Sequence, residues 1–211
     1  MNPTKPLLRG HFHQAMFFIT VGACALLIAK SSTPKEYIAT SIYSVGALLM
    51  FGISGLYHRI NWKPDARFFM KKLDHSAIYI MIAGTFTPIC LLSLPEESGR
   101  NLLMAIWGIT FVGIIQSIFF VNLPKYISAI IYMIAGYMIL PYLSVLTLTL
   151  GLTNVILIAV GGVIYSLGAI SYGLKKPAMS PMIFGYHELF HIMVCLGATL
   201  HFIVIYSILG D

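Results

Sequence analysis

The chain has 211 residues, of which 58% are hydrophobic and only 9% are charged, and its mean hydropathy is +0.87. Soluble domains carry about 25% charged and about 45–50% apolar residues, so this composition excludes a soluble globular protein. The formal net charge of +6 would suggest a nucleic-acid partner in a soluble protein, but the basic residues here lie in short segments between apolar runs. We therefore expect a polytopic membrane protein with no nucleic-acid partner.

Seven apolar runs are each long enough to cross a bilayer, which takes about 20 helical residues. They span approximately residues 13–29, 37–58, 73–94, 101–121, 126–147, 152–173 and 186–209. The first run also resembles a cleaved signal peptide, but the second run follows so closely that a first membrane helix is favoured. The prediction is an all-α bundle of seven transmembrane helices, forming a single domain over residues 1–211 in the cell membrane.

Lysine and arginine are concentrated in alternate connections between the runs, and such residues are in excess in cytoplasmic loops. With the N-terminus inside, the cytoplasmic segments hold ten of them and the outer segments three. The inner residues are Lys5, Arg9, Arg59, Lys63, Arg67, Lys71, Lys72, Lys125, Lys175 and Lys176, and the outer ones are Lys30, Lys35 and Arg100. We therefore expect a cytoplasmic N-terminus and an outer C-terminus.

Several residues within the runs predict packing rather than chemistry. The three cysteines, Cys24, Cys90 and Cys195, form no Cys-x-x-Cys pair, so we expect small buried side chains and no disulfide or thiolate metal site. Pro88 and Pro141 lie inside the third and fifth runs and are expected to bend those helices.

Ionisable residues inside membrane helices are costly and are therefore the first candidates for a functional site. His58 ends the second run, Asp74 opens the third, and His187 and His191 open the seventh. The lysine and arginine distribution alone places all four at the cytoplasmic ends of their helices. That three separate helices carry these residues at the same depth in the membrane is the strongest indication of function in the sequence.

These residue types suit a zinc site, because neutral imidazoles favour zinc and catalytic sites combine three protein ligands with an open position. His187 and His191, four residues apart, share one face of a helix, and His58 is expected to be the third ligand. Asp74 would hold or deprotonate a water molecule, or bind the metal directly. Ser54, one turn from His58, could hydrogen-bond the water, Asp74 or a substrate carbonyl.

Other interpretations of these residues stay open. The segment 187–191 also matches the His-Glu-x-x-His motif of zinc proteases, in which the glutamate is the general base. We disfavour the protease, because no later carboxylate is available as a third ligand on that side of the membrane, and expect Glu188 to face the loop or to stabilise the helix N-terminus. His75 is expected to be structural. His201 lies roughly 15 Å beyond His191 along the helix, so we expect a buried hydrogen-bonding residue there.

Three segments of the chain resemble the hemolysin III group of bacterial membrane proteins, which belongs with the progestin and adiponectin receptor family and, more distantly, the alkaline ceramidases. The segments are Ser54-Gly-Leu-Tyr-His58, Leu73-Asp74-His75-Ser76 continuing to Ala83-Gly84-Thr85-Phe86-Thr87-Pro88, and His187-x-x-x-His191. The resemblance covers essentially the whole chain. It implies a seven-helix bundle with a cytosolic N-terminus and zinc held by His58, His187 and His191. It also implies that Asp74 positions a zinc-bound water, with Ser54 close by.

The resemblance further implies a chemistry, because members similar to the adiponectin receptors are associated with hydrolysis of lipid amides. We expect a zinc-dependent hydrolase of a ceramide-like or fatty-acyl lipid, or a lipid sensor in membrane homeostasis. Asp74 would be the general base, and Ser54 or Tyr57 would stabilise the oxyanion. The alternatives are a pore-forming haemolytic protein and a receptor in which zinc is structural, and the oligomeric state is left open.

Overall fold

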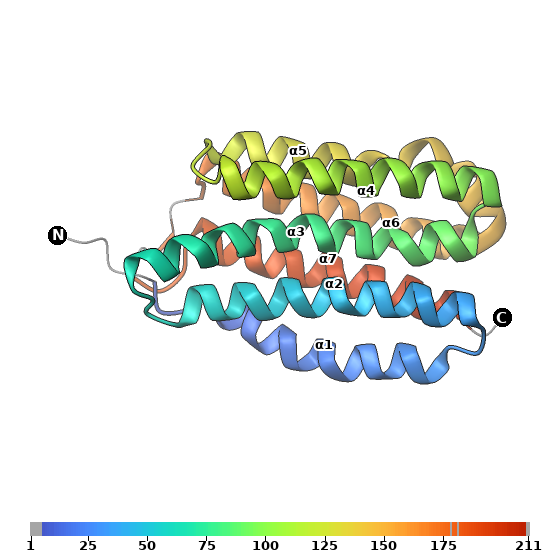
Figure 1. The fold of residues 1–211 in the computed structure, drawn as a ribbon, viewed down its shortest axis with the longest axis horizontal. Helices are drawn as coiled ribbons and strands as arrows, with labels where there is room; N and C mark the ends of the chain where they lie inside the picture. Colours follow the sequence, from blue (N-terminus) through green and yellow to red (C-terminus); the bar gives the residue numbers. More distant parts are fainter. Residues whose placement is uncertain (1–5, 178, 181, 210–211) are drawn as a thin grey trace.

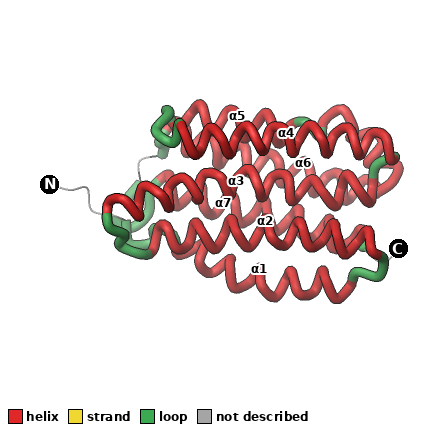
Figure 2. Tube along the Cα trace, in the orientation of Figure 1, coloured by secondary structure: helices red, strands yellow, loops and turns green. Residues whose placement is uncertain are grey.

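A computed structural model of the chain describes residues 6–177, 179–180 and 182–209, and Figure 1 shows long helices lying side by side. The helices are α1 (His11–Lys30), α2 (Pro34–Arg59), α3 (Pro64–Ser93), α4 (Glu96–Phe119), α5 (Lys125–Tyr137), the short 3-10 helix η1 (Leu140–Tyr142), α6 (Leu143–Leu174) and α7 (Tyr186–Ile208). The described residues contain no strand, only an isolated bridge between Ser180 and Phe184 (Figure 2). The predicted all-α class is confirmed.

Six segments of the described chain are long and apolar enough to cross a membrane, which is the architecture of a multi-pass membrane protein. Five are α1, α2, α3, α4 and α7, and the sixth is the 49-residue stretch Tyr126–Leu174. The count is six rather than the predicted seven because the runs 126–147 and 152–173 both fall within that stretch. A straight helix of this length would measure more than twice the roughly 30 Å of a bilayer core.

The stretch Tyr126–Leu174 is interrupted at two places. α5 ends at Tyr137, four residues before Pro141, because proline lacks an N–H and its ring clashes with the carbonyl four residues earlier. Gly151 has φ 77° and ψ 160°, a conformation outside the helical region that glycine adopts readily. Pro88, in contrast, lies inside α3 without ending it.

The two parts of this stretch lie against each other in opposite directions. Tyr137 Oη lies 2.7 Å from Ser166 Oγ, and a Cβ on Gly173 would lie 3.5 Å from the Cα of Tyr126. Contacts between the beginning of the stretch and its end require the chain to reverse between them, as Figure 1 shows near the yellow-to-orange transition. The stretch is therefore a helical hairpin.

The first and last helices run in the same direction. At one end, the N–H of Leu7, just before α1, donates to the carbonyl oxygen of Met182, just before α7, at 2.9 Å. At the other end, Lys30 Nζ donates to the carbonyl oxygen of Tyr206 at 3.0 Å. α1 and α7 therefore begin at one end of the bundle and finish at the other.

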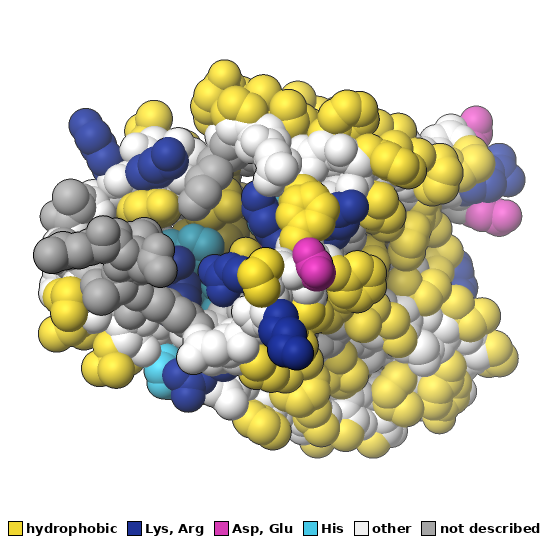
Figure 3. Space-filling model, turned by 60° about the vertical axis from the view of Figure 1, so that its left-hand side comes forward, with side chains coloured by type: hydrophobic (Ala, Val, Ile, Leu, Met, Phe, Trp, Pro, Cys, Tyr) yellow, Lys and Arg dark blue, Asp and Glu magenta, His cyan; other side chains and the backbone are white. Residues whose placement is uncertain are grey.

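α3 lies at the centre of the bundle and the other helices surround it. In its most apolar 18-residue window 72% of the residues are buried, against 22% for α1, and α3 contacts α2, α4, α5, α6 and α7. The outer surface exposes large apolar side chains such as Phe18, Phe111 and Leu148, and Figure 3 shows hydrophobic side chains, in yellow, over much of the face that it draws. An apolar surface of this extent suits contact with lipid chains rather than water.

Most of the basic side chains lie at the end of the bundle where α1, α3 and α7 begin and α2 finishes. Figure 3 looks toward this end and shows lysine and arginine side chains in dark blue with histidine in cyan among them. Lys5 and Asp211, which also entered the prediction of orientation, lie outside the described residues. We call this end the basic end.

Candidate metal site

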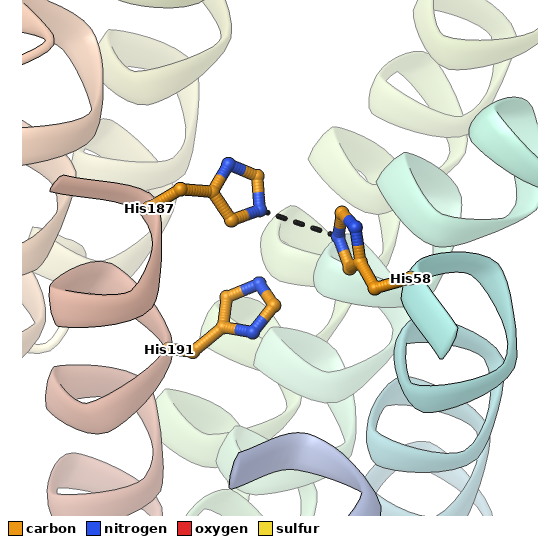
Figure 4. A group of neighbouring side chains, drawn as sticks. All are labelled: His58, His187 and His191. Carbon is orange, nitrogen blue, oxygen red and sulfur yellow. Dashed lines mark hydrogen bonds between the residues drawn. The ribbon is translucent and has the colours of Figure 1, made fainter. Parts of the chain in front are cut away.

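Three histidine side chains from two helices meet near the basic end. His58 is the second-last residue of α2, and His187 and His191 lie in the first two turns of α7. One nitrogen of each ring lies within 4.8 Å of the others, and all three residues are buried. Figure 4 shows the rings pointing toward one another, with His58 Nε2 and His187 Nε2 3.2 Å apart.

The geometry of these three rings fits a shared metal ion. Two nitrogens bound at about 2.0–2.1 Å to tetrahedral zinc are about 3.3 Å apart, close to the 3.2 Å between His58 and His187. In addition, His191 Nδ1 is buried without a hydrogen-bond partner among the described residues. Buried polar atoms are rarely unsatisfied, and a cluster of imidazoles with such an atom suits an ion that accepts nitrogen lone pairs.

Asp74 faces the same cluster from α3. Its Oδ2 lies 3.8 Å from His58 Nε2 and 3.8 Å from His75 Nδ1. These distances exceed a direct hydrogen bond and leave room for a bridging water. α3 begins nine residues before the predicted run 73–94, so Asp74 projects from within an established helix rather than from its first turn.

A pocket opens beside these residues and is lined in part by Ser54, Asp74 and two of the histidines. Tyr132 from α5 and Tyr172 from α6 also line it. Tyr57, which the sequence suggested for the oxyanion, is not among the lining residues and packs beside the His58 ring, with its centroid 4.5 Å away. The phenol groups that reach the pocket therefore come from helices that the sequence did not connect with the site.

His13 of α1 is a fourth histidine at the site and was missing from the prediction. It is 1% exposed, and its ring stacks on His191 with centroids 3.8 Å apart and planes inclined by 7°. Its Nδ1 lies 2.9 Å from Ser54 Oγ. The predicted topology could have identified it, because His13 is the first residue of the run 13–29 and lies on the same side of the membrane as the other site histidines.

Glu188, which lies between two of the candidate ligands in sequence, is fully buried but does not line the pocket. Its Oε2 accepts from the N–H of Gly185 at 2.8 Å, which caps α7 as expected for a carboxylate at a helix N-terminus. Its Oε1 forms an ion pair with Arg9. This contact ties α7 to the segment before α1, and the sequence did not predict it.

Two other histidines within the helices, His75 and His201, have backbone partners. His75 Nδ1 donates to the carbonyl oxygen of Lys71 at 2.8 Å, although its ring also reaches the pocket. His201 Nε2 donates to the carbonyl oxygen of Ile158 at 3.2 Å, in the other half of α7. Both contacts agree with the structural roles expected for these residues.

Gly10 places the beginning of α1 directly against the site. Its φ is 82°, in the left-handed region that side chains rarely adopt. A Cβ at this position would lie 2.5 Å from the Cβ of His58. Both the backbone conformation and the close approach to His58 therefore require glycine here.

The chain matches the family described as "Haemolysin-III related" over residues 1–202. It is 33% identical over 187 residues to "Hemolysin-3" of Bacillus cereus, covering 87% of this chain and 82% of that protein. It is 31% identical over 193 residues to "Hemolysin-3 homolog" of Bacillus subtilis (strain 168), covering 90% and 87%. Human "Monocyte to macrophage differentiation factor" is 24% identical over 201 residues, with coverage of 93% and 81%. These similarities extend over nearly all of the helices.

Proposed function

We propose that this chain, which belongs to the haemolysin-III related family, is a zinc-dependent hydrolase of a lipid amide such as ceramide. The observation that carries the proposal is the convergence of three buried histidine nitrogens within 4.8 Å of one another beside Asp74 and Ser54. Zinc bound by His58, His187 and His191 would polarise a lipid carbonyl and make a water molecule more acidic.

The other residues of the pocket have roles that follow from their positions. Asp74 lies close enough to His58 to accept a proton from a water held between them, as a general base does. Ser54 lines the pocket together with Asp74, and its hydroxyl would orient the carboxylate by donating to it. Tyr132 and Tyr172 line the pocket as well, and the Tyr132 hydroxyl donates to the carbonyl oxygen of His75 at 3.5 Å.

We propose that the chain crosses the membrane seven times, with the hairpin Tyr126–Leu174 crossing twice. Support comes from the direction of the helices: α1 and α7 run parallel, while α1 to α4 alternate. α7 can then begin at the basic end only if the intervening hairpin leaves that end and returns to it. Gly151 would lie at the reversal.

We further propose that the basic end faces the cytoplasm and that the membrane is the cell membrane. The excess of lysine and arginine at that end supports this orientation. The histidine cluster lies about one to two turns inside it, near the depth of lipid amide and ester carbonyls in the inner leaflet. A ceramide-like lipid could then reach the site without leaving the membrane.

The test is to purify the protein in detergent, measure bound metal and follow fatty-acid release from ceramide. We expect one zinc per chain in wild type, with release that falls by at least 100-fold in Asp74→Asn while the zinc is kept. Absence of zinc would overturn the metal site. Zinc-loaded protein that cleaves neither amide nor ester lipids would overturn the hydrolase and leave a receptor with structural zinc.

The name of the Bacillus cereus relative describes a haemolysin, so a pore is the competing function for this chain. A pore would release dye from liposomes without using the histidine cluster. Dye release that persists in His191→Ala would therefore favour a pore, whereas release that disappears with lipid hydrolysis would make lysis a consequence of the enzyme.

A further inference from the structure

α1 supplies none of the three candidate ligands, yet it contributes the side chain that covers one of them. His13 lies in the first turn of α1 and packs face to face on His191, with ring centroids 3.8 Å apart. The Phe51 ring of α2 also packs against the His13 ring, with centroids 5.3 Å apart and planes inclined by 83°. His13 is thus held between α2 and α7, and its stack restricts the rotation of the His191 ring.

His13 Nδ1 lies 2.9 Å from Ser54 Oγ, and the direction of this hydrogen bond depends on the tautomer of His13. With the proton on Nδ1, His13 donates to Ser54 Oγ, and the Ser54 hydroxyl can then point its hydrogen at the Asp74 carboxylate, which only accepts. This tautomer leaves Nε2 without a proton. Nε2 is buried and has no hydrogen-bond partner among the described residues.

We propose that His13 is a positioning residue with two separable functions, an inference that rests on the proposed metal site and hydrolase. Its ring holds His191 in the orientation that binds metal, and its Nδ1–H holds Ser54 so that the Ser54 hydroxyl points at Asp74. Groups that orient metal ligands from behind typically contribute 10–100-fold to metal affinity. The ring should therefore control metal affinity, and the Nδ1–H should control the general base.

Two substitutions separate these functions. His13→Phe retains a flat ring that can stack on His191 but has no donor for Ser54. His13→Asn retains an amide N–H that can donate to Ser54 but has no ring. His201→Phe is the matched control, because His201 is also a histidine inside the bundle, partly buried and with a backbone partner, and it lies in the other half of α7.

The experiment measures zinc affinity by competition with a chelator, the visible absorption of cobalt-substituted protein, ceramide hydrolysis at saturating zinc, and thermal unfolding of the metal-free form. We expect His13→Asn to lose 10–100-fold in zinc affinity, with an altered cobalt spectrum. His13→Phe should keep affinity within about threefold and lose at least tenfold in hydrolysis at saturating zinc. His201→Phe should match wild type in affinity, spectrum and hydrolysis.

Several outcomes would overturn the inference. If both His13 variants keep wild-type affinity and hydrolysis, the residue positions nothing. If both lose affinity and hydrolysis equally while the metal-free forms unfold at lower temperature, its role is only structural. A wild type that binds no metal would overturn the proposed function and this inference together. A wild type that binds zinc without hydrolysis would remove the second function only, and the affinity and spectrum of His13→Asn would still decide the first.

Discussion

The two halves of α7 both direct histidine into the bundle, fully buried in the first half and partly buried in the second. In the first half, His187 and His191 face His58 of α2 and the carboxylate of α3, and His13 of α1 covers His191. In the second half, His201 meets a backbone carbonyl of α6 and the ring of Tyr165, 5.3 Å away. Each half also leaves one imidazole nitrogen buried without a partner among the described residues, His191 Nδ1 and His201 Nδ1.

The difference shows that burial of a histidine, or even an unsatisfied nitrogen, does not make a site. What distinguishes the first half is that four helices direct ionisable or polar groups at one point, at the end of the bundle where basic residues gather. In the second half, the partners that His201 meets are a backbone carbonyl of α6 and the Tyr165 ring. Convergence of side chains from separate helices is therefore the feature to test.

The largest expected effect comes from removing a histidine in each half of α7. His191→Ala should remove one of three nitrogens and lower zinc affinity by at least 100-fold, because two remaining imidazoles form an incomplete site. His201→Ala should leave zinc affinity within about twofold of wild type. Metal content after dialysis against a weak chelator measures both. Equal zinc loss in the two variants would break the distinction between the halves.

The helices were predictable because a bilayer imposes a length and an apolar composition that can be counted. Hydropathy describes the part of a helix inside the membrane, however, and not the whole helix. α3 begins at Pro64, nine residues before the apolar run that predicted it. The charged residues of this first part, including Lys71 and Lys72, belong to the same helix but do not contribute to its hydropathy signal. The stretch Tyr126–Leu174 differs in another way, because the predicted runs 126–147 and 152–173 are separated near Gly151 whereas the observed helical turns continue on both sides of it.

The candidate ligands were predictable because they lie at the same depth in the membrane, and the distribution of basic residues shows which end of each helix lies on the cytoplasmic side. The depth of a residue in the membrane does not, however, show which helices are neighbours. His13 was missed because its importance depends on α1 packing against α7, helices at opposite ends of the sequence. Arg9 was counted only as a topological charge, yet it pairs with Glu188, 179 residues away. Contacts of this kind depend on packing, which has no local signature.

A second test uses two glycines that press on the histidines of the two halves. Gly10→Ala would place a Cβ 2.5 Å from that of His58 and force a left-handed φ of 82° on alanine, which costs about 1–3 kcal/mol. Gly161→Ala would meet His201 Nε2 at 2.6 Å without that backbone strain. Both should lower the thermal midpoint in detergent, but only Gly10→Ala should also weaken zinc binding. Unchanged zinc affinity in Gly10→Ala would show that α1 does not position His58.

The smallest expected effects come from the polar contacts that tie α1 to each end of α7. At the basic end, Arg9 pairs with Glu188, whose side chain is 0% exposed, while that of Arg9 is 23% exposed. Removing one partner of a buried pair costs most when the charge left behind is buried. Arg9→Met should therefore destabilise by about 2 kcal/mol, below the range for fully buried pairs because Arg9 is partly in contact with solvent. Glu188→Gln should cost about 1 kcal/mol or less, since glutamine still caps α7.

Lys30→Met is the matched control at the other end, where Lys30 Nζ contacts the Tyr206 carbonyl and lies 4.4 Å from the Tyr206 ring centroid. Contacts at such a water-facing position contribute little, so the thermal midpoint should stay near that of wild type. Thermal unfolding of metal-free protein measures all three variants, and zinc affinity is measured beside it. If Glu188→Gln lowered the thermal midpoint more than Arg9→Met and also weakened zinc binding, the carboxylate would have a role at the site beyond capping α7 and pairing with Arg9. The comparison between the two halves would then have to include Glu188 among the groups that converge on the histidines.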